Sequence, residues 1–203
     1  MVHDEHNEHV DNHDDAHAHG RQIRQAHLAG SGGQRFLDVQ LGLTRHVISQ
    51  VFEGAGLVNA LYAVTSEAYL TVDGSSRPKA ELFDSEDGTY SFSFKIHNFG
   101  AADKTYTLSS SLLTEDFVTK GGKDFMAGYD RALSGTVKFS QDTVTVAAGG
   151  TASVTVTIKL SAEDKAWMAE HYVNGNYVEG FIYLEGANDD TVDLSLPFLG
   201  FYG

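Results

Sequence analysis

Histidines recur every three or four residues at the amino terminus of this 203-residue chain. The segment reads "HDEHNEHVDNHDDAHAH", and its imidazoles are the chain's densest potential metal ligands. Residues three or four apart share one face of a helix, and paired imidazole nitrogens bind zinc, nickel or copper. The candidate metal ligands are therefore His3, His6, His9, His13 and His17.

No framework is evident that would hold these histidines in place. Acidic residues and two asparagines interrupt the run, which makes it a poor helix and predicts a disordered tail. The zone 1–34 ends in "AGSGGQ", the composition of a flexible linker. We expect adventitious binding of zinc or nickel there, with a built metal site as the alternative.

Composition excludes several classes of partner. The net charge of −14 would repel nucleic-acid phosphates. The chain has no cysteine, so neither disulfides nor thiolate metal sites are expected. No apolar run approaches the roughly 20 residues that span a membrane, and the polar, acidic N-terminus is unlike a signal peptide. We predict no nucleic-acid binding and no membrane insertion by this segment.

Strict alternation from about residue 67 onward predicts β-strands. "TYSFSFKIHN" places Tyr90, Phe92, Phe94 and Ile96 on one face, as in a half-buried antiparallel strand. "DTVTVAAGGTASVTVTIKL" reads as two strands joined as a hairpin by a glycine turn. "YVEGFIYLEG" and "TVDLSLPFLG" are two further strands, separated by the turn "ANDD".

One helix interrupts the strands. "SAEDKAWMAEHYVNG" begins with Ser161 three residues before Asp164, an aspartate variant of the capping box, and stops before Gly175. Met168 and Tyr172 share a face, so the helix should cap one end of the sheets. The aromatic residues around it would pack there or form a substrate-contacting surface: Trp167, His171, Tyr172 and Tyr177.

These elements predict an all-β fold, an antiparallel β-sandwich of immunoglobulin or fibronectin type III style with one short capping helix. The N-terminal region should be disordered or irregular. We expect three zones: a tail and linker at 1–34, a mixed segment at 35–66, and the sandwich at 67–203. The segment 114–135 reads as a long loop whose aromatic residues either contact a partner or pack on the sandwich.

Two acidic turns raise the question of calcium. "DSEDG" (84–88) and "ANDD" (187–190) carry carboxylates, but the twelve-residue calcium-loop pattern is absent from both. Asp, Asn and Gly are also favoured in turns for backbone reasons alone. We therefore expect ordinary turns and no calcium site.

Several segments, taken in order, resemble a known family. "EGAGLVNALYAV" (53–64) looks like the segment that closes the catalytic domain of subtilisin-like serine proteases. "VEGFIYL" and "LPFLGFYG" look like the fibronectin type III-like domain that follows it in cell-envelope subtilases, such as lactocepin-like proteinases and streptococcal complement-cleaving peptidases. The resemblance covers about residues 52–203 and implies that 35–66 is a remnant of the protease domain.

The catalytic motifs of that family are missing. Neither a His-Gly-Thr-His run nor a Gly-Thr-Ser-Met-Ala run is present, so no triad residue can be carried over. We expect a non-catalytic fragment of a secreted, cell-wall-associated endopeptidase, one that stabilises the protease domain in cis and positions its protein substrates. Residues 1–50 match nothing in the family, and a frameshifted reading is one explanation. The alternatives are a metal-binding protein with a histidine-rich arm, or an adhesin or carbohydrate-binding domain.

Overall fold

The computed structural model describes residues 59–75 and 77–203. The predicted ligands His3, His6, His9, His13 and His17 lie outside this range, as does the whole zone 1–34. The described elements, in chain order, are α4 (Ala60–Thr65), β1 (Ala68–Val72), β2 (Ala80–Ser85), β3 (Thr89–Asn98), β4 (Lys104–Lys120), β5 (Lys123–Ala132), β6 (Thr136–Phe139), β7 (Thr143–Val146), β8 (Thr151–Lys159), α5 (Ala162–His171), β9 (Asn176–Gly186) and β10 (Leu194–Tyr202).

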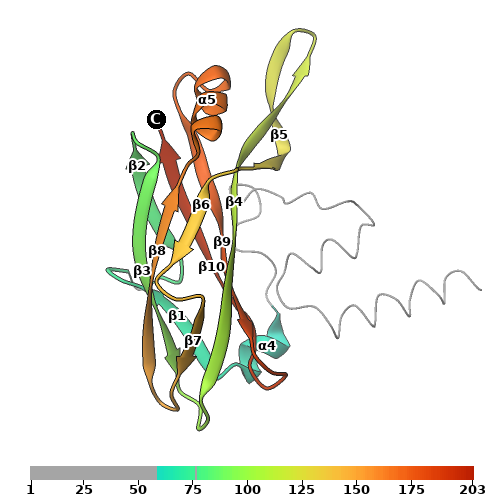
Figure 1. Cartoon of the computed structure of the whole chain (residues 1–203). Coiled ribbons are helices and arrows are strands. Elements are labelled where there is room, and N and C mark those ends of the chain that lie inside the picture. The colour runs from blue at the N-terminus through green and yellow to red at the C-terminus, as the bar shows by residue number, and fades with distance from the viewer. Residues whose placement is uncertain (1–58, 76) are drawn as a thin grey trace, which may run out of the picture.

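The strands form two sheets that face one another. One sheet has the order β1-β3-β8-β6, and the other has the order β2-β10-β9-β4-β5, with β7 also paired to β4. Figure 1 shows the two layers side by side with α5 at one end and α4 at the other. The predicted all-β sandwich with one short capping helix is confirmed.

The core lies between the inward faces of the two sheets. Phe94, Ile96, Val156 and Ile158 project from the first sheet and are fully buried. The alternation of apolar and polar residues that predicted strand β3 therefore also identifies the face of β3 that is buried. The buried side chains of the first sheet pack against inward side chains of β9 and β10 in the second sheet: Val178, Ile182, Leu184, Leu196 and Phe198.

The first two strands divide the chain between the sheets. β1 pairs antiparallel with β3 in the first sheet, whereas β2 pairs parallel with β10, the last strand, in the second. The connection between β1 and β2, which contains Gly74 and Pro78, carries the chain from one sheet to the other. The chain therefore contributes one strand to each sheet before β3 begins.

Two sequence-based expectations are wrong. The segment 114–135 is not a long loop but a hairpin of β4 and β5, turned at Gly121 and Gly122, which both have positive φ. Figure 1 shows this hairpin reaching past the body of the sandwich beside α5. Residues 142–160 are not a hairpin either, because β7 pairs with β4 while β8 pairs with β3 and β6. The turn at Gly149 joins the two sheets.

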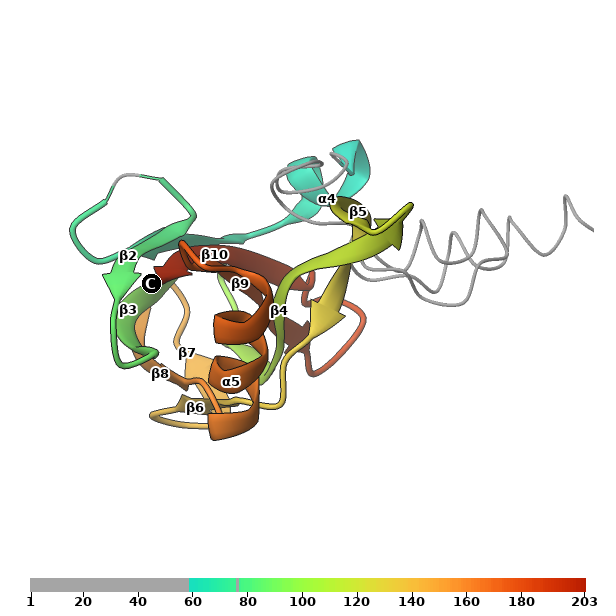
Figure 2. The same ribbon diagram turned by 90° about the horizontal axis from the view of Figure 1, so that it is seen from above.

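The helix α5 has the predicted capping box. The Ser161 hydroxyl accepts from the Asp164 backbone N–H (3.0 Å), and the Asp164 carboxylate accepts from the Ser161 backbone N–H (3.0 Å). Met168 is buried beneath the helix. Seen from above in Figure 2, α5 lies over the end of the sandwich, which is the predicted capping position.

Gly180, in the centre of β9, allows a close approach that a side chain would prevent. A Cβ there would overlap the Ser111 carbonyl oxygen and lie 2.6 Å from Cζ of Phe198. Gly180→Ala should therefore cost about 1–3 kcal/mol of unfolding free energy through overpacking. Gly121→Ala meets nothing within 4 Å and should cost only about 1 kcal/mol, from its positive φ. Equal midpoints for the two variants in urea unfolding would contradict this account.

Asp164 should make the domain sensitive to acid. Burial raises the pKa of its carboxyl, but hydrogen bonds from Ser134 and Ser161 outweigh burial and bring the pKa below its usual value. The ionised form is thus favoured in the folded state, and its contribution is lost as pH falls from about 4 through the lowered pKa. Asp164→Asn should reduce stability at pH 7 by about 1 kcal/mol and flatten this acid-side decline. The exposed Asp142→Asn is the control, and an unchanged pH profile for Asp164→Asn would contradict the assignment.

Candidate functional site

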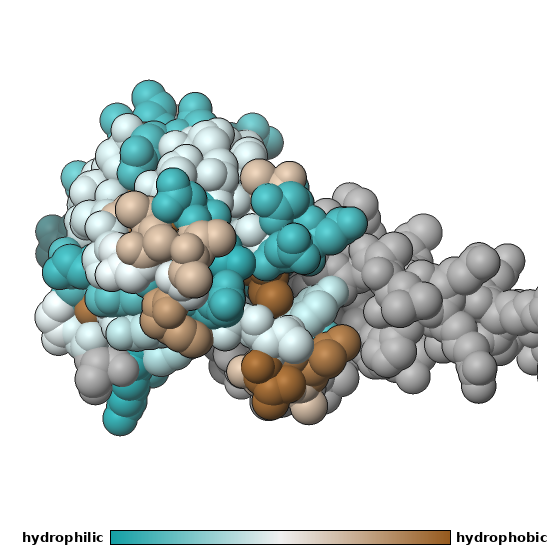
Figure 3. All heavy atoms as spheres, turned by 90° about the horizontal axis from the view of Figure 1, so that it is seen from below, coloured by the Kyte–Doolittle hydropathy of each residue, from teal (hydrophilic) through white to brown (hydrophobic). Residues whose placement is uncertain are grey.

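The segment that leads into the sandwich carries an exposed apolar surface. In α4, the Asn59 side chain caps the helix by accepting from the Tyr62 backbone N–H (3.1 Å). Leu61 is 65% and Val64 80% exposed, and no residue of α4 is buried. Figure 3 shows the resulting hydrophobic patch at this end of the molecule. Leu57 and Val58, which precede α4 in the sequence, lie outside the described residues.

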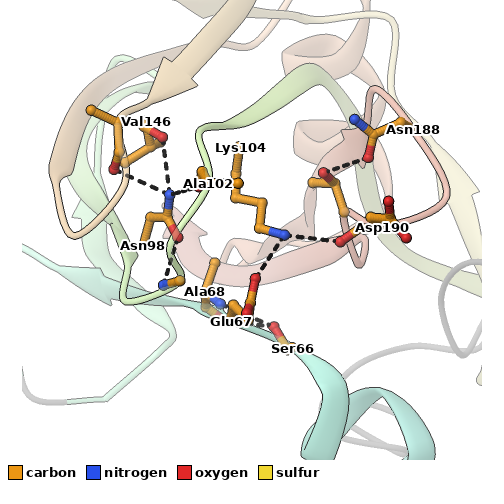
Figure 4. Close-up of polar contacts among 12 residues, drawn as sticks. Ser66, Glu67, Ala68, Asn98, Ala102, Lys104, Val146, Asn188 and Asp190 are labelled. Atoms are coloured by element: carbon orange, nitrogen blue, oxygen red, sulfur yellow. Dashed lines mark hydrogen bonds and ion pairs between the residues drawn. The ribbon is translucent and has the colours of Figure 1, made fainter.

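A buried lysine fixes the segment that follows α4. Lys104 is 7% exposed, and its ammonium donates to Oε2 of Glu67 (2.9 Å) and to the Asp190 carbonyl (3.0 Å). The Glu67 carbonyl also accepts from the Phe99 backbone N–H (2.9 Å). Figure 4 shows Glu67 and Asp190 converging on Lys104 from two loops. The segment is therefore held at both its side chain and its backbone.

Asn98 braces the neighbouring loops. Its amide N–H groups donate to the carbonyls of Ala102 (2.8 Å), Val146 (3.1 Å) and Ala147 (3.1 Å), and its Oδ1 accepts from the Gly100 N–H (3.0 Å). The side chain is 2% exposed, so these bonds replace water in a buried setting. We call Glu67, Asn98 and Lys104 the joint, because Lys104 holds Glu67 on the sandwich while Asn98 braces the loops beside it.

The other end of the molecule carries an aromatic cluster. The Phe117 ring lies 6.0 Å from Trp167, 4.5 Å from His171 and 6.4 Å from Tyr172, centroid to centroid. The Arg131 guanidinium stacks over Trp167 at 4.4 Å. Trp167, His171 and Tyr172 therefore come together as expected. Their centre, Phe117, comes from β4, in the segment that the sequence suggested was a loop.

The fourth expected member of this cluster lies elsewhere. Tyr177 packs edge-on against Phe201 at 5.5 Å.

The Tyr172 hydroxyl donates to the Glu115 carbonyl (3.0 Å). Burial, reinforced by Asp116 and Glu115, raises the pKa of the Tyr172 hydroxyl to about 12. Burial also raises the pKa of the Glu115 carboxyl, and Glu179 raises it further. These contacts bind α5 to the base of the β4–β5 hairpin.

The hairpin itself exposes apolar side chains. Phe125 is 52% and Met126 is 56% exposed, opposite Val118 and Phe117 in the β4–β5 register. The sequence left open whether the aromatic residues of 114–135 pack on the sandwich or contact a partner. Phe117 packs on the sandwich, whereas Phe125 and Met126 face solvent. A two-stranded ribbon that extends beyond a core leaves such residues uncovered.

The two acidic turns are built as ordinary turns. Asp87 accepts from the Ser85 hydroxyl (2.9 Å) and the Thr89 backbone N–H (2.8 Å). In the second turn, Asn188 accepts from the Thr191 hydroxyl (2.9 Å). Across residues 59–75 and 77–203, no group of three histidine or acidic side chains is placed to hold a metal ion. Within the same residues, neither helix is long and apolar enough to cross a membrane.

Two facing, largely antiparallel sheets with a helix across one end define a β-sandwich of the immunoglobulin and fibronectin type III class. Residues 80–199 match the family model described as "Fn3-like domain", and the chain belongs to that family. The motifs that carried the resemblance, "VEGFIYL" and "LPFLGFYG", lie on the adjacent strands β9 and β10.

The chain is also similar to bacterial proteinases. It is 29% identical over 164 residues to the PI-type proteinase of Lactococcus lactis subsp. cremoris and to the PII-type proteinase of Lacticaseibacillus paracasei. In each case the match covers 77% of this chain and 8% of the relative. The chain thus spans about 8% of the length of these curated relatives. The match supports a domain accessory to a protease.

Among solved structures, the PapD-like domain 7 of human CEP192 is similar to this chain with a TM-score of 0.42 and 16% identity. That similarity covers 74% of this chain and 95% of the CEP192 domain. The secreted serine protease VesC from Vibrio cholerae is similar with a TM-score of 0.37 and 12% identity, over 66% of this chain and 23% of VesC.

The joint leads to a prediction about Glu67. Glu67→Gln should lower the unfolding free energy by about 1–2 kcal/mol, since it leaves the buried Lys104 ammonium without its counter-charge. Asp73→Asn, which breaks the exposed Lys95–Asp73 pair (2.8 Å), should cost less than about 1 kcal/mol. Adding Lys104→Met to Glu67→Gln should recover part of the loss in a double-mutant cycle. Strictly additive effects would show that the two residues do not interact.

Proposed function

We propose that this chain is the fibronectin type III-like accessory module of a secreted, cell-envelope subtilisin-like serine endopeptidase. The observation that carries this proposal is the match to the Fn3-like family together with the similarity to PI-type and PII-type proteinases. The sequence contains no subtilase triad motif, so the catalytic residues belong to another part of the parent protein. The role of the module is then geometric.

The proposed contact with the protease domain is made through α4. Leu61 and Val64 form an apolar surface on a segment that resembles the end of a subtilase catalytic domain. Burying these two side chains against the protease body in cis would remove them from water and favour docking. Because the joint fixes the segment after α4, the docked protease domain would have a defined orientation on the sandwich.

A docked sandwich supports the protease in two ways. Its contacts stabilise the folded catalytic domain, since any interaction made only by the native state shifts the folding equilibrium. Its other surfaces extend past the catalytic domain and contact large protein substrates. The hairpin with Phe125 and Met126 is one such surface, because it reaches past the sandwich.

A chimera tests this proposal. The matching segment of the lactococcal PI-type proteinase is replaced by residues 59–203 of this chain, and activity is followed with a short fluorogenic peptide. We expect an active enzyme whose half-life at elevated temperature falls at least several-fold in the double variant Leu61→Asp, Val64→Asp. The matched control is Phe83→Asp with Val173→Asp, two substitutions at exposed apolar residues outside α4.

Two results would contradict the proposal. One is equal thermal inactivation of the α4 variant and the control, which would show that α4 makes no contact with the protease domain. The other is peptide hydrolysis by the purified 203-residue chain that a serine-directed inhibitor blocks, which would place a catalytic site in this chain.

A further inference from the structure

The outer face of the four-stranded sheet carries a regular set of hydroxyl groups. The residues of β3 and β8 that alternate with the core positions point outward, and their partners lie in register. The Ser93 and Thr155 hydroxyls, for example, are hydrogen-bonded across the two strands at 2.9 Å. The hydroxyl-bearing residues of this face include Thr71, Thr89, Ser91, Ser93, Thr136, Thr151, Ser153, Thr155 and Thr157.

Aromatic rings stand at one edge of the same face. Tyr69 on β1 is paired with His97 on β3, and their rings stack at 4.6 Å with an interplanar angle of 11°. Phe99 lies beside Tyr69 at 6.3 Å. Tyr69 is 50% and Phe99 64% exposed. We call Tyr69, His97 and Phe99 the aromatic platform.

The imidazole of His97 holds the platform in place. One ring nitrogen, Nε2, is hydrogen-bonded to the Thr71 hydroxyl (2.8 Å), and the other, Nδ1, to the Thr151 hydroxyl (3.2 Å). Rotation of the ring would break both bonds, so His97 is a fixed backing for Tyr69. A ligand that stacks on this platform loses little freedom in ordering it, which favours binding.

The charge beside the platform is balanced. Lys95 lies between Thr71 and Ser153 in the register of β1, β3 and β8, and its ammonium is paired with the Asp73 carboxylate at 2.8 Å. The exposed Lys138 and Lys159 lie on the same face, but towards the opposite end of β8 from Thr151 and the platform. At the platform itself, the paired charges of Lys95 and Asp73 suit an uncharged ligand better than an anionic or cationic one.

We propose that this face binds a neutral polysaccharide. A sugar ring has an apolar C–H face, which stacks on the electron-rich face of an aromatic ring, and a rim of hydroxyls, which exchange hydrogen bonds with serine and threonine. Tyrosine beside small hydroxyl residues gives contact area and adaptable hydrogen bonding at low entropic cost. An open sheet face accepts a polymer along its length. This binding is independent of any protease function.

Affinity electrophoresis of the purified chain tests the proposal. Native gels contain hydroxyethyl cellulose, soluble starch, galactomannan or arabinoxylan, with polygalacturonic acid as the anionic comparison. We expect retardation by at least one neutral polymer, and Tyr69→Ala should weaken it at least tenfold in fitted Kd. Tyr177→Ala, which removes an exposed tyrosine on β9, is the matched control and should leave Kd unchanged.

A second variant separates ring stacking from folding. His97→Gln removes the imidazole backing and should weaken binding several-fold, while the thermal midpoints of all variants are measured alongside. Absence of retardation by every neutral polymer would overturn the proposal. So would equal Kd values for Tyr69→Ala and Tyr177→Ala, or stronger retardation by polygalacturonic acid than by the neutral polymers.

Discussion

The structure depends on one constraint: two sheets must bury a single apolar layer between them. Fully buried side chains from β3 and β8 meet those of β9 and β10 across that layer. Strand alternation, the crossing of the chain from β1 to β2 and the crossing at Gly149 all serve this packing. Because the inner faces are committed to the core, binding chemistry is confined to the two ends and the outer faces.

Elements whose structure depends on interactions between residues close in sequence could be predicted from the sequence. The capping box of Ser161 and Asp164 involves residues three apart, so the start of α5 could be read directly. The strands β3, β8, β9 and β10 each bury one face, and period-two patterns follow from that. The motifs "VEGFIYL" and "LPFLGFYG" lie on two of these strands and contribute Ile182 and Leu196 to the core.

Where partners are distant in sequence, prediction failed. The glycine turn before β8 looks the same whether it joins two neighbouring strands or two sheets, since only the pairing partners differ. The β4–β5 ribbon has apolar residues on both faces, because the tip has no core beneath it, and so it gave no alternation. Lys104 was missed as part of the joint, although it shares the inward parity of Tyr106 and Leu108.

The parallel pairing of β2 with β10 has a mechanical consequence. β10 is the last strand, whereas β2 follows β1, and the register of β2 with β10 runs from Ala80 beside Phe198 to Ser85 beside Tyr202. A force that pulls on the N-terminal end of β2 and the C-terminal end of β10 drags these parallel neighbours in opposite directions along a common axis. The hydrogen bonds between them are then loaded together in shear rather than opened one by one. Once β1 has been pulled from β3, this shear geometry resists the separation of β2 from β10.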